Sequence, residues 1–128
     1  SAGYVHHDGR QAAVIQVDQT ASDDQILRQI CMHIVSLRPV AASQAEIDPA
    51  LIAKEREILS EQARATGKPE QVIEKIVEGR MRNFFAERVL PEQAFALDSS
   101  KTVGEVLNDV GVKLERFVRW ELGESTAT

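Results

Sequence analysis

The sequence predicts an α+β fold in which a small antiparallel sheet is covered by one helix and interrupted by a long helical hairpin. Three observations support this prediction. Two short apolar runs flank an Asp-Gly dipeptide near the start, two consecutive helical patterns fill the middle, and a run with period-2 alternation lies near the end. With 128 residues, 43% apolar and 27% charged, the chain is expected to form one globular domain over residues 1–128, with 49–88 as an insertion.

The composition limits the classes of partner and the compartment. The net charge is −5, and Lys and Arg are interleaved with acidic residues, which argues against nucleic acid as the main partner. The single cysteine, Cys31, excludes an internal disulfide and fits a reducing compartment. Apolar runs are only a few residues long and no leader-like segment opens the chain, so we expect a cytoplasmic protein without a membrane span.

The first part of the chain predicts a β-hairpin followed by a helix. Residues 4–7 and 10–17 flank Asp8-Gly9, a dipeptide that suits a two-residue hairpin turn. A capping-box pattern at Ser22 then opens an amphipathic helix that ends before Pro39. This helix is expected to cover one face of the sheet.

The last part predicts a short helix and a closing strand. Thr102 and Glu105 repeat the capping-box pattern and open a helix to about Asp109. Residues 113–122 alternate with the period of a strand. We expect this strand to join the opening hairpin and to bury the face that carries Trp120.

The middle of the chain predicts a helical hairpin. Asp48-Pro49 is a helix start, and Gly67 and Pro69 mark a stop and a restart between two helices. Each helix has about 18 residues and is roughly 27 Å long, and so short a link makes them antiparallel neighbours. The apolar repeats predict a seam formed by Leu51, Ile52, Ile58, Leu59, Gln62 and Ala65 on the first helix, and by Ile73, Ile76, Val77, Arg80, Met81 and Phe84 on the second.

Two adjacent histidines, His6 and His7, are the first candidate for chemistry. Neighbouring strand residues project to opposite faces of a sheet, so the two imidazoles cannot easily bind one metal ion. With the turn at Asp8-Gly9, His7 pairs with Arg10, and a cation is a poor neighbour for a metal-binding imidazole. No third ligand stands at a suitable spacing. The pattern favours a structural role for His6 and a surface position for His7.

The other reactive residues do not form a catalytic pattern. Cys31 and His33 are two positions apart on a helix and point to different sides, which argues against a thiol–imidazole pair and favours a packed His33. The acids of the hairpin alternate with Lys and Arg, as on a solvated helix face. No glycine-rich phosphate loop occurs. The sequence therefore predicts a binding module without a cofactor, not an enzyme.

The hairpin itself predicts a contact with a partner. A projecting hairpin buries only its own seam, so it gains little stability for each residue that it orders. Its tip, Thr66–Pro69, is the natural contact point.

Six motifs occur in an order that resembles a known family. They are Y-x-H-H-x-G-R, CMHIVSLRP, EKIVEGRMRNFF, PEQAF, KTVGEVL and RFVRWELGE, and they extend over residues 3–124. In this order they resemble bacterial translation elongation factor Ts, and only the C-terminal part of its core. Residues 49–88 then correspond to the coiled-coil insertion of that family.

The resemblance implies a protein partner, elongation factor Tu, and the release of GDP from it as the activity. It places His7, with Arg10 beside it, on the surface that faces the β-barrel domain of Tu. It also implies that the helical hairpin reaches the nucleotide-binding domain of Tu. Gly67 and Lys68 at the tip and Arg80 on the second helix are the corresponding candidate contacts.

Two departures from the family bear on activity. The T-D-F-V segment, which disturbs the magnesium site of Tu, and the N-terminal helical module do not occur in these residues. An exchange factor acts only through binding that opposes nucleotide binding, so we expect this chain to dock on Tu but to exchange nucleotide poorly alone. The chain is then either a fragment of a longer Ts protein or its natural C-terminal piece.

A rival prediction comes from a different class of protein. It is a self-associating structural module without Tu binding, in which the hairpin or an exposed sheet edge dimerises. The sequence leaves a homodimer open, because the edge of a small sheet can pair with a copy of itself.

Overall fold

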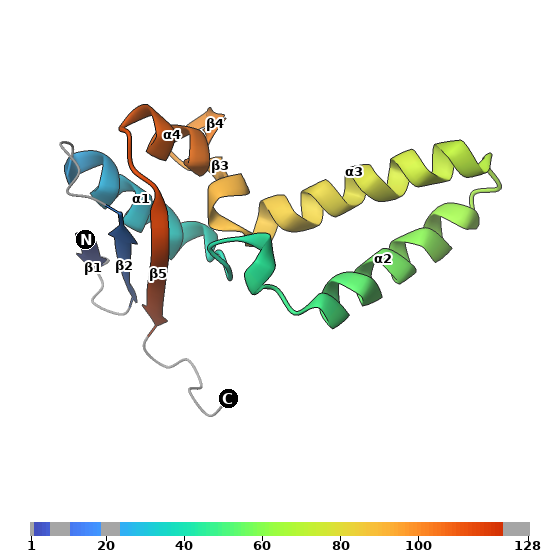
Figure 1. Cartoon of the computed structure of the whole chain (residues 1–128), viewed down its shortest axis with the longest axis horizontal. Coiled ribbons are helices and arrows are strands. Elements are labelled where there is room, and N and C mark those ends of the chain that lie inside the picture. Colours follow the sequence, from blue (N-terminus) through green and yellow to red (C-terminus); the bar gives the residue numbers. More distant parts are fainter. Residues whose placement is uncertain (1, 6–10, 19–23, 122–128) are drawn as a thin grey trace.

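The computed structural model describes residues 2–5, 11–18 and 24–121, and shows a sheet domain from which a helical hairpin projects (Figure 1). We call residues 48–88 the hairpin and the other described residues the sheet domain. The elements, in chain order, are β1 (Ala2–Val5), β2 (Gln11–Val17), α1 (Asp24–Leu37), α2 (Pro49–Arg64), α3 (Glu70–Arg88), β3 (Ala94–Phe95), β4 (Asp98–Thr102), α4 (Val103–Asp109) and β5 (Leu114–Glu121). The predicted α+β class is confirmed.

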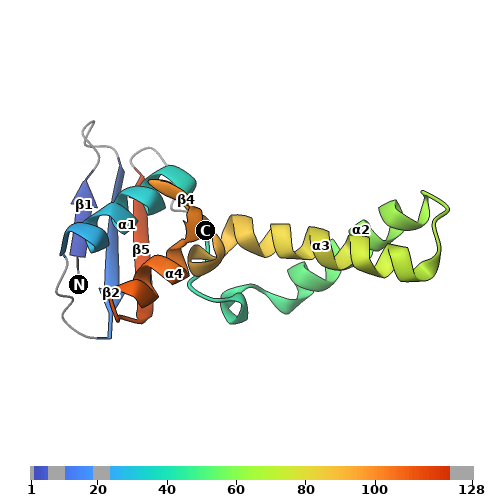
Figure 2. The ribbon, with the colours of Figure 1, turned by 90° about the horizontal axis from the view of Figure 1, so that it is seen from above.

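The main sheet joins the opening hairpin to the last strand, as predicted. Its strands are antiparallel in the order β1-β2-β5, and α1 packs across β1 and β2 on one face (Figure 2). Val5 lies opposite Ala12, the pairing that a two-residue turn at Asp8-Gly9 would produce. Those turn residues and the predicted cap of α1, Ser22, lie outside the described ranges. Ile15 is completely buried under α1, in agreement with the alternation of β2.

The closing strand joins the sheet as predicted, but its faces are the reverse of the prediction. Trp120 is 52% exposed and Val118 is 41% exposed, whereas Phe117 packs against the buried core. The pairing with β2 shifts by one residue at Glu115, which forms a bulge. Because one extra residue reverses the in-out alternation, Leu114 and Phe117 share the core side and the indole of Trp120 points away from it.

Two charged residues, Arg119 and Glu121, lie at the end of β5 on the face that α1 covers, and both form ion pairs. Glu121 accepts from Arg38 at 3.0 Å and from Arg119 at 3.3 Å. Arg38 follows α1 directly and has a left-handed φ of 53°, a conformation that ends the helix. The ion pairs therefore join the C-terminus of α1 to the last strand.

The hairpin begins at the predicted signals. The carboxylate of Asp48 accepts a hydrogen bond from the Ala50 N–H at 2.9 Å, and Pro49 occupies the first helical position. α2 ends at Arg64, slightly earlier than predicted, and Gly67 reverses the chain with a φ of 72°.

The seam between α2 and α3 is only partly the predicted one. Its buried residues are Leu59, Ala63, Ile73, Val77, Met81 and Phe84, with Ile52, Ile76 and Phe85 partly buried beside them. The predicted seam residues Leu51, Ile58, Gln62, Ala65 and Arg80 are exposed instead. Consecutive residues are 100° apart around a helix, so the series through Leu51 and the series through Ile52 cannot both face α3.

The two ends of the hairpin leave the sheet domain side by side. The backbone N–H groups of Val40 and Ala41 both donate to the Arg88 carbonyl, at 2.8 and 3.2 Å. The Leu90 N–H donates in turn to the Ala41 carbonyl at 2.9 Å, next to a parallel bridge between Ala41 and Val89. The connector and the end of α3 are thus fixed to each other.

The segment after the hairpin contains two short strands that the sequence patterns did not predict. β3 and β4 pair with each other as a separate two-stranded sheet. The predicted capping box of α4 is present: the Glu105 N–H donates to the Thr102 hydroxyl at 3.2 Å, and the Thr102 N–H donates to the Glu105 carboxylate at 3.0 Å. α4 adds Val106 and Leu107 to the core under α1.

Candidate partner-binding surfaces

Three of the five predicted contact residues lie in the part of the chain that the structure describes, and these three do not gather into one site. His7 and Arg10 lie outside the described residues. Gly67 and Lys68 are exposed at the tip of the hairpin, and Arg80 is exposed on α3. About ten residues of helix separate Arg80 from the tip, which is roughly 15 Å along the axis. A partner that contacts Gly67, Lys68 and Arg80 would have to follow the hairpin over this distance.

The thiol of Cys31 and the imidazole of His33 are both buried in the sheet domain. Burial raises the pKa of the Cys31 thiol to about 11, so this residue stays protonated and unreactive at neutral pH. Among the described residues, no cluster of three or more His, Cys, Asp or Glu could hold a metal ion. Over the same residues, no helix has the length and apolar character needed to cross a bilayer.

His33 is the hub of a buried hydrogen-bond chain that connects α1 to the root of the hairpin. The Ala96 N–H donates to Nδ1 of His33 at 3.0 Å, so the ring proton is on Nε2, which donates to Oε1 of Gln93 at 2.8 Å. Nε2 of Gln93 then donates to the Glu87 carbonyl in the last turn of α3 at 2.9 Å. Burial lowers the pKa of the His33 imidazole, which is 1% exposed, and keeps it neutral. The prediction of a packed histidine is confirmed.

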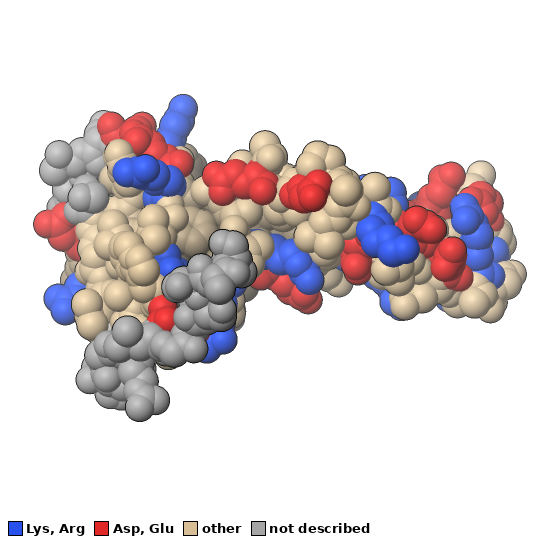
Figure 3. Space-filling view, turned by 90° about the horizontal axis from the view of Figure 1, so that it is seen from below, with Lys and Arg blue, Asp and Glu red and all other residues tan. Residues whose placement is uncertain are grey.

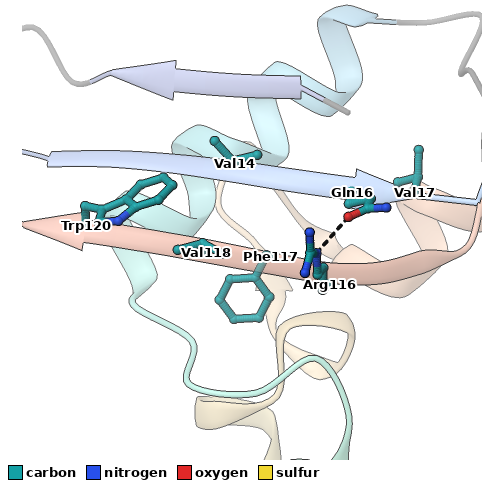
Figure 4. A pocket seen from close by; sticks show the side chains of 7 residues that line it. All are labelled: Val14, Gln16, Val17, Arg116, Phe117, Val118 and Trp120. Atoms are coloured by element: carbon teal, nitrogen blue, oxygen red, sulfur yellow. Dashed lines mark hydrogen bonds between the residues drawn. The ribbon is translucent and has the colours of Figure 1, made fainter. Parts of the chain in front are cut away.

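The face of the sheet opposite α1 is open and apolar. Figure 3 shows a broad uncharged surface on this side of the sheet domain. In Figure 4, Val14, Val118 and Trp120 stand side by side from β2 and β5. They line a shallow hollow of about 500 Å³ together with Gln16, Val17, Arg116 and Phe117. An open sheet face of this composition fits a protein partner.

The polar end of this open face is organised by hydrogen bonds. Nε of Arg116 donates to Oε1 of Gln16 at 2.7 Å (Figure 4), and Nε2 of Gln16 donates to Glu115 at 3.2 Å. The open face therefore has an apolar part around Trp120 and a polar border. Sequence reasoning missed it, although Ala12 and Val14 alternate with the buried Ala13 and Ile15, so that both faces of β2 are apolar.

The hairpin carries ion pairs along one side of its seam. Arg56 pairs with Glu78, and Arg64 pairs with Glu70 at 3.7 Å. With Ser60 and Glu74, these residues line a hollow of about 200 Å³ between the two helices. All of them are solvated, and Figure 3 shows acidic and basic side chains interspersed along the hairpin. This agrees with the predicted solvated face.

Comparisons with known proteins identify the family. The model of the family "Elongation factor TS" matches residues 1–124. Relatives named elongation factor Ts include one from Hyphomonas neptunium, 42% identical over an alignment of 128 positions that covers 96% of this chain and 42% of the relative. Another, from Deinococcus radiodurans, is 43% identical over 122 residues, or 95% of this chain and 45% of the relative. The chain thus spans less than half the length of these curated relatives, and over that span it belongs to the elongation factor Ts family.

Proposed function

We propose that this chain binds elongation factor Tu and contributes to GDP/GTP exchange on it during translation in the cytoplasm. The match of the elongation factor Ts family model to residues 1–124 is the observation that supports this function. Residues 1–128 would act as the C-terminal, dimerisation-type domain of the family, with 49–88 as its coiled-coil insertion. Such an exchange needs no covalent chemistry and no cofactor from this chain.

The shape of the chain suits a partner with two separate contact regions. The sheet domain and the tip of the hairpin lie at opposite ends of the molecule (Figure 1). Binding at both ends holds the partner in one relative orientation, and linked contacts raise affinity beyond either contact alone. We propose that His7 and Arg10 contribute to the contact at the sheet domain, and Gly67, Lys68 and Arg80 to the contact along the hairpin.

Docking and exchange are separable activities. Contacts that are equally strong in nucleotide-bound and nucleotide-free Tu give affinity without accelerating GDP release. The T-D-F-V segment that the family uses to disturb the Tu magnesium site does not occur in this sequence. We therefore expect docking with weak exchange.

The test measures both activities on the same proteins. Binding of the chain to Tu is measured by calorimetry, and GDP release by the fluorescence of a labelled GDP, with a full-length relative as the positive control. The expected result is measurable binding with GDP release much slower than the full-length relative produces. Absence of binding would refute the proposal, and release as fast as with the full-length protein would refute the separation of docking from exchange.

A homodimer is a second candidate, supported by the open sheet face around Trp120 rather than by the family match. Two such faces packed together would bury the exposed residues Val14, Val118 and Trp120. Light scattering over a concentration series gives the oligomeric state. A monomer at all concentrations would exclude the dimer. It would not count against the proposed binding to Tu.

A further inference from the structure

The hairpin meets the sheet domain at a narrow junction. It extends from one end of the sheet domain, and α3 runs directly into that junction (Figure 1, Figure 2). Phe84 and Phe85 belong to the apolar contacts of the hairpin, whereas Leu90 belongs to the core under α1. Among the described residues, the buried seam and this core have no member in common. The direction of the hairpin therefore depends on the contacts made at the junction rather than on a shared core.

The backbone bonds at the junction join the two ends of the hairpin to each other. The N–H groups of Val40 and Ala41 donate to the Arg88 carbonyl, and the Leu90 N–H donates to the Ala41 carbonyl. A small apolar group at the same place comprises Ala41, Ile47 and Val89, with Ile52 and Phe85 partly buried beside them. In the described part of the chain, α1 contributes no residue to this group. These contacts do not by themselves fix α3 relative to α1.

Gln93 spans the junction from the side of the sheet domain. Its backbone N–H donates to the Leu90 carbonyl at 3.2 Å, and its carbonyl accepts from the Val103 N–H at 3.0 Å, so its main chain is held at the start of α4. Its side-chain amide accepts from Nε2 of His33 on α1 at 2.8 Å and donates to the Glu87 carbonyl on α3 at 2.9 Å. One buried side chain thus relates α1 to α3.

His33 is itself held in one orientation. Its Nδ1 accepts from the Ala96 N–H at 3.0 Å, and its ring stacks on Phe95 with the ring centroids 5.9 Å apart. His33 is 1% exposed and Gln93 is 3% exposed, so water does not compete for the hydrogen bond between them. A buried hydrogen bond adds little net stability over an apolar pair of the same shape, but its geometry is specific. The pair therefore suits a positioning role better than a purely stabilising one.

We propose that the buried pair His33–Gln93 fixes the direction of the hairpin relative to the sheet domain, and so holds the two contact regions of the chain at the spacing that a single partner requires. Because both residues are buried, they are positioning residues that act through α3. The importance of this direction for binding to Tu rests on the function proposed above. α3 has 19 residues and is about 28 Å long, so a rotation of about 10° at its root moves the tip by about 5 Å. Such a displacement prevents the two ends from binding one rigid partner together.

The first test measures the direction of the hairpin in the chain alone, without Tu. Spin labels are attached at Arg28→Cys on α1 and at Gln71→Cys near the tip of α3, two exposed positions, and double electron–electron resonance gives the distance distribution between them. The thiol of Cys31 is 0% exposed, so the label spares it. The first test variant, Gln93→Met, keeps the volume of the side chain and removes both of its hydrogen bonds. The second, His33→Leu, removes the bond between α1 and Gln93 from the other side.

Gln44→Met is the matched control, because it makes the same substitution near the same junction. Nε2 of Gln44 donates to the Glu92 carboxylate at 2.9 and 3.1 Å, but Gln44 is exposed and this bond involves neither α1 nor α3. Circular dichroism and thermal melting verify that each protein is folded at the temperature of the measurement. If Gln93→Met does not fold, His33→Leu decides the result.

We expect a narrow distance distribution in the parent and in Gln44→Met, a distribution at least about twice as broad in Gln93→Met, and a smaller broadening in His33→Leu. A purely stabilising pair would change the melting temperature without broadening the distribution of the folded protein. Unchanged distributions in the test variants overturn the inference. Equal broadening in Gln44→Met and Gln93→Met overturns it too, because the effect would then not belong to the buried pair.

The second test measures the affinity of the same variants, without labels, for Tu by calorimetry. Affinity is expected to fall at least about fivefold in Gln93→Met and to stay within about twofold of the parent in Gln44→Met. Unchanged affinity in Gln93→Met, together with a broadened distribution, overturns the connection between hairpin direction and docking. If the parent does not bind Tu, the proposed function fails, whereas the distance distributions still decide whether the pair fixes the hairpin.

Discussion

The sheet domain surrounds α1 with buried side chains from several elements, whereas the hairpin buries a single row of side chains between two helices. In the sheet domain, Ile30 and Ile34 are 0% exposed and belong to the largest group of buried core residues. In the hairpin, the seam residues are buried between two helices alone, and the ion pairs beside them are exposed. The comparison shows that the sheet domain tolerates little change in its interior. The hairpin can open locally, and its outer faces are free to serve binding.

The largest loss of stability is expected in the sheet domain. Ile34→Ala should reduce the free energy of unfolding by roughly 2–5 kcal/mol, because it leaves a cavity in a completely buried site. Chemical denaturation measures this value. A loss below about 1 kcal/mol would show that the core is looser than the burial of Ile34 implies.

A seam substitution is expected to affect the hairpin alone. Leu59→Ala should cost about 2 kcal/mol, at the low end for such a change, because Leu59 is 8% exposed and the two helices can close around the smaller side chain. Amide hydrogen exchange should accelerate in residues 49–88 and stay slow in α1 and β2. Equal acceleration in both regions would mean that they unfold as one unit.

The link between the two regions is expected to depend on pH through His33. Its pKa is lowered in the folded state from the ordinary value of 6.5, so the unfolded chain takes up the proton first as the pH falls. Stability is therefore complete above pH 6.5 and declines below it, because a proton on Nδ1 would face the donating Ala96 N–H. Unfolding measured between pH 7.5 and 5 should show this decline in the parent and a smaller one in His33→Gln. Subtracting one curve from the other removes the contribution of the other histidines. Parallel curves would contradict the assignment of this pH dependence to His33.

The smallest change is expected at the open sheet face. Trp120→Ala should lower the free energy of unfolding by no more than about 1 kcal/mol, because the indole is 52% exposed. A buried tryptophan would cost about 3–5 kcal/mol, so the melting temperature distinguishes the two placements. A large loss of stability would instead indicate that Trp120 is buried, as the simple alternation of β5 predicts.

The features that the sequence predicted correctly depend on local chemistry. Asp48 and Thr102 cap their helices as expected, and the register of β1 with β2 fits a turn at Asp8-Gly9. The bulge at Glu115 could not be predicted, because it depends on how β5 meets β2 across nearly the whole chain. The choice between the Leu51 and Ile52 series on α2 likewise depends on where α3 lies.

The candidate contacts could be predicted only in part. The tip residues Gly67 and Lys68 follow from the helix stop signals, and their exposure is confirmed. The open sheet face was missed because we expected Trp120 to be buried, which placed this face of β5 in the core. His7 and Arg10 remain a prediction, because they lie outside the described residues.

The backbone bonds between the two ends of the hairpin have a consequence for the history of the chain. Since Ala41 and Leu90 are already hydrogen-bonded neighbours, the chain is joined across the base of the hairpin, and the last turn of α3 adds the Glu87 carbonyl to which Gln93 donates. A single deletion or insertion event between these positions would remove the hairpin or change its length without shifting the register of any strand. For the protein engineer, the same junction is a natural exchange point at which one helical arm can be replaced by another.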